Sequence, residues 1–332
     1  MIPLTLLTGF LGSGKTTVLA HLLRQPGFGD TAVIINEFGD VGLDHELIET
    51  SDEDLVTLKT GCLCCKMRGD LVTTLDDLLA RRGAGQISPF SRVLIETSGL
   101  ADPVPIVQSV LVDGVAAANF SMSHVVTVVD SVTGKETLKR EPEAVKQVAL
   151  ADQILLTKTD LPEGDAAGLQ PVIRGLNAHA PIAGVVHGDI APSVLMRSDE
   201  ADPSDRMLRI ETIEAGHVQT VPHDAISTFS LVRDDPVPAV ALTLLLEALA
   251  DHCGSDLLRL KGLVQIAEYP RQPAVIHGVQ HVFHPPRWLD AWPSDDWRTR
   301  MVFIARNLDE DWVRSLLGTI ELEVAELAAA SR

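Results

Sequence analysis

Residues 9–16 read Gly9-Phe10-Leu11-Gly12-Ser13-Gly14-Lys15-Thr16 and fit the pattern G-x-x-x-x-G-K-[ST] of a phosphate-binding P-loop. The flanking residues supply the context that such a loop requires. Residues 2–7 form a short apolar run typical of a buried strand, and residues 17–23 repeat apolar side chains at helical spacing. A glycine-rich turn that matches by chance would lack this strand-loop-helix arrangement. The stretch therefore predicts an α/β protein of the P-loop NTPase class.

In a P-loop the glycines let the backbone wrap a phosphate, with N–H groups pointing inward at the positive end of a helix. We expect Lys15 to act in catalysis by reaching the β- and γ-phosphates, and the Thr16 hydroxyl to bind Mg²⁺. The residues predicted to hold the nucleotide in this loop are Gly9, Gly12, Ser13, Gly14, Lys15, Thr16 and Thr17.

The composition is that of a globular protein with enough material for two domains. The chain has 332 residues, of which 45% are hydrophobic. No apolar run reaches the roughly 18 residues that span a bilayer. The apolar N-terminus lacks the basic segment of a signal peptide and runs directly into the P-loop. We therefore expect a cytoplasmic protein without a membrane partner.

Acidic residues outnumber basic ones. Lys and Arg number 27 against 46 Asp and Glu, which gives a net charge of −19. Nucleic-acid binding needs clustered cations, so this balance argues against a nucleic-acid partner and favours cations or basic partners. Three of the four cysteines fall within four positions, a pattern that does not suit a disulfide framework.

Apolar runs alternate with helical patterns along the first 198 residues, which predicts a parallel sheet covered by helices on both faces. A polar, acidic stretch follows, and we place a linker over residues 199–216. The second domain is expected over residues 217–325. The strands predicted for the first domain are residues 2–7, 31–35, 55–58, 92–95, 125–129, 154–156 and 182–186.

The second domain is predicted to be a smaller α+β unit, because strand patterns there are accompanied by few helices. We predict strands within 217–232 and over 263–267, 274–278 and 301–305, and helices over 237–250 and 308–317. Cys253 stands alone in an apolar helix and is expected in the core. His277, His281 and His284 are expected mainly as surface residues, with metal contact as the alternative.

A second nucleotide signal is Thr157-Lys158-Thr159-Asp160, which directly follows a predicted strand. GTPases commonly carry [NT]-K-x-D at this place. The Asp160 carboxylate can accept both N–H donors of guanine, while the stem of Lys158 packs along the base. Adenine offers the wrong donor pattern, so these residues favour GTP as the ligand. The alternative is a solvated turn.

Two carboxylates end predicted strands of the same sheet. Glu96 is followed three residues later by Gly99, which resembles a nucleotide switch: a carboxylate near Mg²⁺, then a glycine whose N–H senses the γ-phosphate. Glu37 ends a neighbouring strand and is a second candidate for the metal or the attacking water. The alternative for Glu96 is a plain helix-capping acid, and a structural role is open for Glu37 as well.

Cys62, Cys64 and Cys65 form a C-x-C-C motif. Thiolates bind Zn²⁺ and other soft metals well. Structural zinc sites usually use two C-x₂-C pairs, and the sequence has no second pair. Three thiolates with an exchangeable fourth ligand would form a site able to release its metal. Burial as small apolar residues and redox chemistry are the alternatives.

Taken together, these motifs resemble those of the CobW-type P-loop GTPases, which include zinc metallochaperones, cobalamin-biosynthesis proteins and nitrile hydratase activators. The resemblance covers nearly the whole chain. It rests on residues 8–17, 36–39, 61–65, 96–103 and 157–160, and in the second domain on residues 259–263, Trp288, Arg300, Phe303 and Ile304.

The resemblance implies that the cysteine motif binds zinc, or another divalent ion such as Co²⁺, and communicates with the nucleotide. Thr157 replaces the commoner Asn. The long His-rich loop of some members is absent, so we do not expect metal storage. We predict a GTPase that couples hydrolysis to metal delivery, with the second domain recognising a client metalloprotein. The alternatives are a small-molecule phosphotransferase with structural cysteines and a GTP-gated binding module. The client, the metal and the oligomeric state, a homo-oligomer included, stay open.

Overall fold

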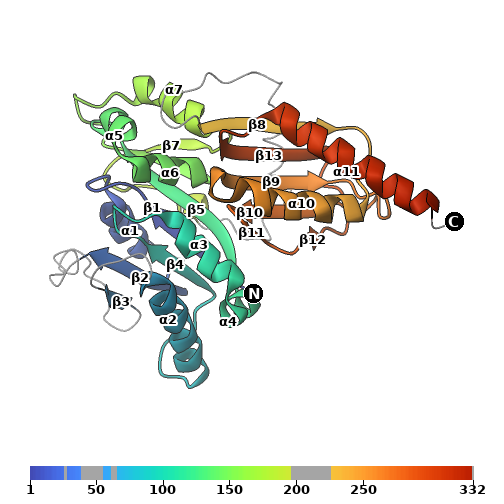
Figure 1. Cartoon of the computed structure of the whole chain (residues 1–332). Coiled ribbons are helices and arrows are strands. Elements are labelled where there is room, and N and C mark those ends of the chain that lie inside the picture. The colour runs from blue at the N-terminus through green and yellow to red at the C-terminus, as the bar shows by residue number, and fades with distance from the viewer. Residues whose placement is uncertain (26–27, 39–54, 61–65, 196–225, 331–332) are drawn as a thin grey trace. The chain divides into compact units, whose positions relative to one another are not determined.

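The computed structural model describes residues 1–25, 28–38, 55–60, 66–195 and 226–330 (Figure 1). The chain divides into two compact units. The first comprises Met1–Ile173 and Ala180–Glu200, and the second comprises Arg174–His179 and Ala201–Arg332. The linker predicted over 199–216 lies outside the described residues.

The first unit is built on a seven-stranded sheet with the order β3-β2-β4-β1-β5-β6-β7. Every neighbouring pair in this sheet is parallel, which confirms the predicted sheet type. All its strands therefore end at the same edge. The strands are β1 (Ile2–Thr8), β2 (Thr31–Phe38), β3 (Leu55–Thr60), β4 (Arg92–Glu96), β5 (Phe120–Asp130), β6 (Gln153–Thr157) and β7 (Ile182–Val185).

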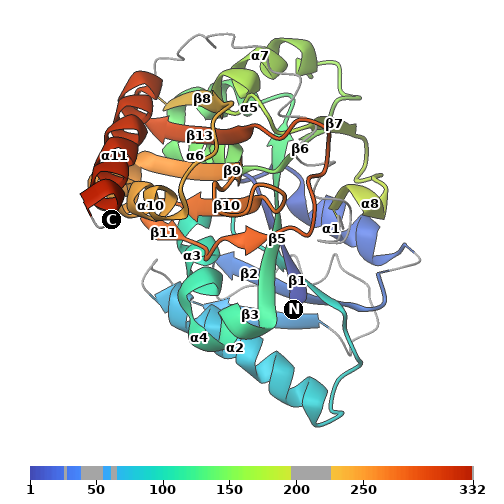
Figure 2. The ribbon, with the colours of Figure 1, turned by 90° about the vertical axis from the view of Figure 1, so that its right-hand side faces the viewer.

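Helices cover this sheet on both faces because alternate strand residues point to opposite sides. Val126 and Val128 of β5 belong to a cluster of buried side chains with Val18 and Leu22 of the first helix. Thr127, between them, faces the other way, where its hydroxyl bonds to α6. Figure 2 shows this unit from a second side. Its helices are α1 (Lys15–Leu23), α2 (Lys66–Gly83), α3 (Pro103–Val112), α4 (Gly114–Asn119), α5 (Gly134–Arg140), α6 (Pro142–Leu150), α7 (Ala166–Leu176) and α8 (Pro192–Leu195).

The second unit has a six-stranded sheet with the order β11-β10-β9-β13-β8, and β12 pairs with β10. Its pairs are antiparallel. Side chains of α10 and α11 pack with one face of this sheet in a single apolar core, as expected for an α+β unit. The elements are β8 (Ile226–Arg233), α10 (Ala239–Cys253), the 3₁₀ turn η2 (Gly254–Asp256), β9 (Leu257–Val264), β10 (Ala274–Val279), β11 (Val282–Phe283), β12 (Arg287–Trp288), β13 (Thr299–Arg306) and α11 (Glu310–Ala330).

Two predicted elements of the second unit had wrong bounds. The strand predicted over 263–267 is β9, which ends at Val264. The chain leaves the ladder there because the N–H of Gln265 donates to the Thr299 hydroxyl at 3.0 Å. The helix predicted over 308–317 is α11, which continues to Ala330 because helix-favouring Glu, Leu and Ala residues follow Gly318. Cys253 is half-buried against the apolar core.

Within the described ranges of the chain, no helix combines the length and the apolar character needed to cross a membrane.

Candidate functional site

The P-loop joins the end of β1 to the start of α1. Gly12 and Gly14 have positive φ angles of 72° and 96°, a region that favours glycine. A Cβ atom on Gly9 would lie 2.3 Å from the Val128 carbonyl oxygen, so only glycine fits between the loop and β5. Local sequence thus dictates the loop conformation, and the N-terminus of α1 presents its N–H groups to this loop.

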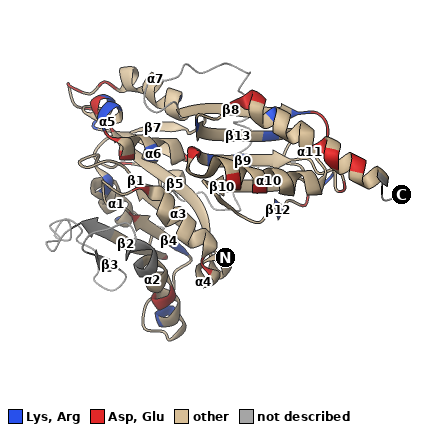
Figure 3. Ribbon diagram, viewed as in Figure 1, with Lys and Arg blue, Asp and Glu red and all other residues tan. Residues whose placement is uncertain are grey.

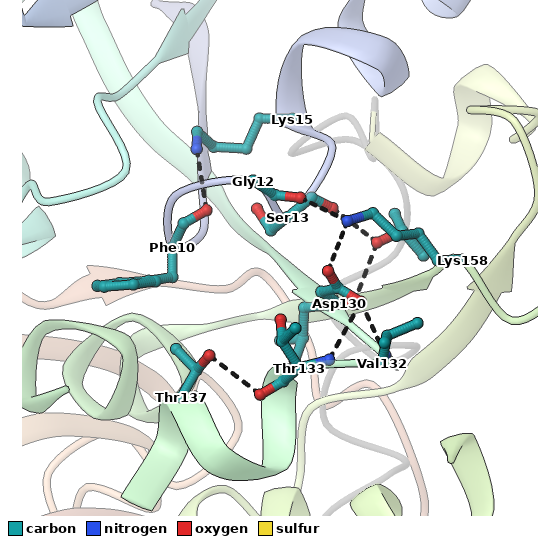
Figure 4. A network of polar contacts seen from close by, with 11 residues as sticks. Phe10, Gly12, Ser13, Lys15, Asp130, Val132, Thr133, Thr137 and Lys158 are labelled. Carbon is teal, nitrogen blue, oxygen red and sulfur yellow. Dashed lines mark hydrogen bonds and ion pairs between the residues drawn. The ribbon is translucent and has the colours of Figure 1, made fainter. Parts of the chain in front are cut away.

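Lys15 begins α1 and is only 8% exposed. Its Nζ donates to the carbonyl oxygen of Gly9 at 2.9 Å and to that of Phe10 at 3.3 Å. Figure 4 shows the lysine reaching back over the loop to Phe10. These contacts hold the ammonium group at the mouth of the loop, where a phosphate chain would be neutralised.

Thr16 and Glu96 come together from distant parts of the sequence. The Thr16 hydroxyl donates to Glu96 Oε1 at 2.9 Å, and Glu96, the last residue of β4, is 5% exposed. A hydroxyl and a carboxylate are hard oxygen ligands of the kind that Mg²⁺ prefers. The donor set at this point therefore fits Mg²⁺, with Thr16 and Glu96 as its holders.

The segment after β4 lies directly against the P-loop. The N–H of Thr97 donates to the Leu7 carbonyl oxygen at 3.0 Å, and the Thr97 hydroxyl donates to that of Thr8 at 2.8 Å. Gly99 follows, and a Cβ atom on it would lie 2.6 Å from the backbone nitrogen of Leu11. The glycine is therefore required by close approach, and its backbone is beside the loop that would wrap the phosphates.

Thr157 and Lys158 fasten the end of β6 to the P-loop. The Thr157 hydroxyl donates to the Ser13 carbonyl oxygen at 2.6 Å, and Lys158 Nζ donates to the Gly12 carbonyl oxygen at 2.9 Å. Lys158 Nζ also pairs with Asp130 Oδ2 at 2.6 Å (Figure 4). The lysine stem thus runs across the loop, and the Thr157 hydroxyl holds the loop backbone at Ser13.

Asp160 lies two residues beyond Lys158, in the turn after β6. The N–H of Leu161 donates to the Lys158 carbonyl oxygen at 3.2 Å and closes this turn. Asp160 Oδ2 is 3.7 Å from His187 Nε2, and the carboxylate side chain is 31% exposed. The carboxylate is therefore partly exposed at the edge of the sheet where β6 ends.

Asp130 and His187 were not singled out from the sequence. Asp130 directly follows the apolar residues of β5, and a carboxylate at the end of a parallel strand is a signal that could have found it. Its Oδ1 also accepts from the N–H of Val132 at 2.7 Å, which shapes the next turn (Figure 4). His187 follows β7 with a positive φ of 51°, and nothing local predicts that it approaches Asp160.

For four other predicted site residues, Glu37 and the three cysteines of the C-x-C-C motif, the structure does not describe the side chains. Glu37 lies on β2, with its backbone registered to Lys59 of β3, and its side chain is outside the description. Cys62, Cys64 and Cys65 lie outside the described residues. Among the residues that the structure does describe, no group of three or more His, Cys, Asp and Glu side chains could hold a metal ion.

Two of the three predicted histidines are joined through the backbone, and one of these two has a shifted pKa. The N–H of His284 donates to the His277 carbonyl oxygen at 2.9 Å, across the turn between β10 and the following strand. Burial lowers the pKa of His284 below the usual histidine value.

Elsewhere in the described chain, Lys and Arg are interspersed with Asp and Glu on several elements (Figure 3).

Two family domains match the sequence. The CobW/HypB/UreG nucleotide-binding domain matches residues 3–184, and the C-terminal domain of the cobalamin synthesis protein cobW matches residues 226–321. The zinc chaperone YjiA of Escherichia coli strain K12 is 35% identical over 314 residues, which cover 95% of this chain and 97% of that protein. The zinc chaperone CobW of Pseudomonas aeruginosa is 32% identical and covers 96% of this chain and 91% of that protein.

A solved structure agrees with these matches. The crystal structure of Zn(II)-bound YjiA GTPase from E. coli superposes with a TM-score of 0.69 at 31% identity. It covers 96% of this chain and 98% of that one. The similarity therefore extends over both units.

Proposed function

The chain belongs to the CobW/HypB/UreG family of P-loop GTPases, and on this premise we propose that it is a zinc chaperone that couples GTP hydrolysis to delivery of the metal to a client protein. GTP is held by the P-loop and Mg²⁺ by Thr16 and Glu96. Lys15 neutralises charge on the transferring phosphoryl group. The Asp160 carboxylate selects guanine by accepting hydrogen bonds from the two N–H donors of the base. Glu37 acts beside Glu96, at the metal or the attacking water.

The observation that carries this proposal is the strand order β3-β2-β4-β1. Parallel strands end at one edge, and neighbouring strands are about 4.8 Å apart. Cys62 follows the end of β3 by two residues in the sequence, while the P-loop follows β1 and the Glu96–Gly99 segment follows β4. A metal held by the cysteine motif is therefore expected roughly 10–15 Å from the phosphates.

This closeness provides the coupling. We expect a γ-phosphate that orders the segment after β4 to alter the geometry of the cysteine thiolates, because the C-x-C-C motif follows β3 of the same parallel sheet in the sequence. Linkage then requires that each ligand change the affinity of the other by the same factor. The GTP-bound and GDP-bound forms of the protein then differ in zinc affinity. Such a difference is what delivery of the metal requires.

The second unit is proposed to recognise the client metalloprotein. Its sheet and two helices form a core of their own, so it can present a surface without altering the nucleotide sheet. We place the protein in the cytoplasm, where closely spaced thiols stay reduced. A homo-oligomer is compatible with this scheme and is not required by it.

The experiment that tests the metal assignment replaces Cys64 and Cys65 by Ser. Zinc affinity, measured by competition with a chromogenic chelator, should fall by at least a hundredfold, because two thiolate ligands are lost. GTP binding should be retained, because the P-loop is a separate set of backbone donors, and zinc-stimulated hydrolysis should disappear. Cys253→Ser is the matched control and should leave zinc affinity unchanged. Retained zinc affinity in the double variant would exclude the motif as the metal site.

A further inference from the structure

Gln147 of α6 is a fully buried amide beside the P-loop, and its side chain reaches the segment after β4. Its Nε2 donates to the carbonyl oxygens of Gly99 at 3.2 Å and of Ala101 at 3.0 Å. Gln147 also lines a small cavity together with Phe10 and Leu11 of the P-loop. Within the described residues the Gln147 Oε1 atom makes no hydrogen bond. The side-chain amide therefore acts through its two Nε2 hydrogen bonds to Gly99 and Ala101.

The position of this amide is itself fixed. The Gln147 carbonyl oxygen accepts from the Thr127 hydroxyl at 2.7 Å, which ties this turn of α6 to β5. The preceding residue, Lys146, pairs with Asp102 Oδ2 at 2.6 Å, and the other Asp102 oxygen accepts from the N–H of Val104 and caps α3. Adjacent residues of α6 therefore hold both ends of the segment 99–102.

The P-loop also lies close to this segment. Gly99 approaches the Leu11 backbone so closely that no side chain fits. The segment therefore contacts both the loop that would wrap the phosphates and helix α6. Three of the contacts on the α6 side are hydrogen bonds to Gly99, Ala101 and Asp102.

We propose that Gln147 is a positioning residue for γ-phosphate binding, so that its loss weakens binding of GTP more than binding of GDP. By holding the Gly99 and Ala101 carbonyl groups, it keeps the segment ordered where the Gly99 N–H can meet a γ-phosphate. Without the amide, that order has to be established on binding, which lowers affinity. The loss falls on GTP because GDP has no γ-phosphate for the segment to meet. The proposal rests on nucleotide binding and not on metal delivery.

The chain supplies a matched control. Gln153, on β6, is also buried, and its Nε2 donates to two backbone carbonyl oxygens, those of Ile154 at 3.2 Å and Pro181 at 3.0 Å. Neither acceptor belongs to the P-loop or to the segment after β4. Replacing Gln153 therefore removes two hydrogen bonds of the same kind from a buried site and leaves the contacts of residues 99–102 intact.

The test compares Gln147→Met with Gln153→Met in Mg²⁺ buffer without added zinc. Affinities for a non-hydrolysable GTP analogue and for GDP are measured by calorimetry, and the melting temperature of each variant is recorded. We expect Gln147→Met to bind the analogue about tenfold more weakly, with GDP affinity within twofold of the parent. Gln153→Met should lower the melting temperature similarly and leave both affinities unchanged.

Equal losses for the two nucleotides, no loss for either, or the same change in Gln153→Met would overturn the proposal. If Gln147→Met does not fold, Gln147→Asn takes its place with Gln153→Asn as control, because the shorter amide cannot reach both carbonyl groups. Since no zinc is present, failure here leaves the zinc-chaperone proposal standing, and failure of zinc binding leaves this one standing.

Discussion

The Thr16 hydroxyl and the Glu96 carboxylate are joined by a 2.9 Å hydrogen bond, although 80 residues separate them in sequence. This bond links the first turn of α1 to the end of β4. The segment that follows Glu96 then passes Leu11 of the P-loop and reaches α6. Thr16, the expected Mg²⁺ ligand, is therefore connected through Glu96 to the segment that would sense the γ-phosphate.

Lys15→Ala should lower kcat for GTP hydrolysis by 10²–10³-fold, because it removes a positive charge that stabilises the transferring phosphoryl group. Phosphate release at saturating GTP is the measurement. Lys139→Ala is the control, since that lysine lies on the surface of α5, where it pairs with Glu136. A Lys15 variant that kept more than about a tenth of the parental kcat would contradict the assignment.

Asp160→Asn should weaken GTP binding and relax the preference for guanine, because an acceptor of two N–H donors becomes a mixed group. Competition between GTP and xanthosine triphosphate measures the preference. Glu163→Gln, an exposed change in the same turn, should have no effect. An unchanged preference in the Asp160 variant would mean that this carboxylate does not read the base.

Gly99→Ala should impair GTP hydrolysis by at least tenfold, because the added methyl group would lie 2.6 Å from the Leu11 nitrogen and force the segment off the P-loop. GDP binding should be affected less than binding of a GTP analogue. Gly83→Ala, at the end of α2, meets nothing within 4 Å and serves as control. Parental hydrolysis in the Gly99 variant would show that this close approach is not needed.

The second unit offers a pH prediction. A side-chain hydrogen bond from Arg298, together with the charges of Arg298 and Arg300, lowers the pKa of Asp296 from 3.8 to about 2. A depressed carboxyl pKa contributes stability that is present above pH 4 and is lost as the pH falls toward 2. Asp296→Asn should therefore lower the free energy of unfolding at pH 7 by about 1 kcal/mol, allowing for solvent screening.

Denaturant unfolding at pH 7 and at pH 3 checks this prediction. The difference between parent and Asp296→Asn should shrink at the lower pH. Asp295→Asn, the exposed neighbour, should match the parent at both values. A difference that stayed constant between the two pH values would assign the effect to packing instead of charge.

Much of the first unit could be predicted from the sequence, because its buried parallel strands are continuous apolar runs. The seven predicted runs correspond to the seven strands of the sheet. The second unit was harder. β9 contains Arg259, Lys261 and Gly262 within its length, so the predicted apolar run at 263–267 overlaps only the end of this strand. Alternating strands with one polar face carry a weaker signal than buried ones.

The candidate site was predictable where a short motif fixes its own geometry, as in the P-loop, where Gly12 and Gly14 adopt the positive φ angles that glycine favours. It was not predictable where a partner arrives through sheet order. Asp130 meets Lys158 because β5 and β6 are neighbours in the sheet. Gln147 meets Gly99 because α6 packs beside the segment after β4. Neither adjacency can be deduced from one sequence, since spacing along the chain does not fix strand order.

Linkage between zinc and nucleotide is measured as the difference in zinc affinity between two nucleotide states. The measurement is chelator competition under anaerobic conditions, with the protein saturated either with GDP or with a non-hydrolysable GTP analogue. We predict that the two zinc affinities differ by at least fivefold, the lower end of typical coupling between sites. Equal zinc affinities in the two states would contradict the account and leave a GTPase that carries a structural metal.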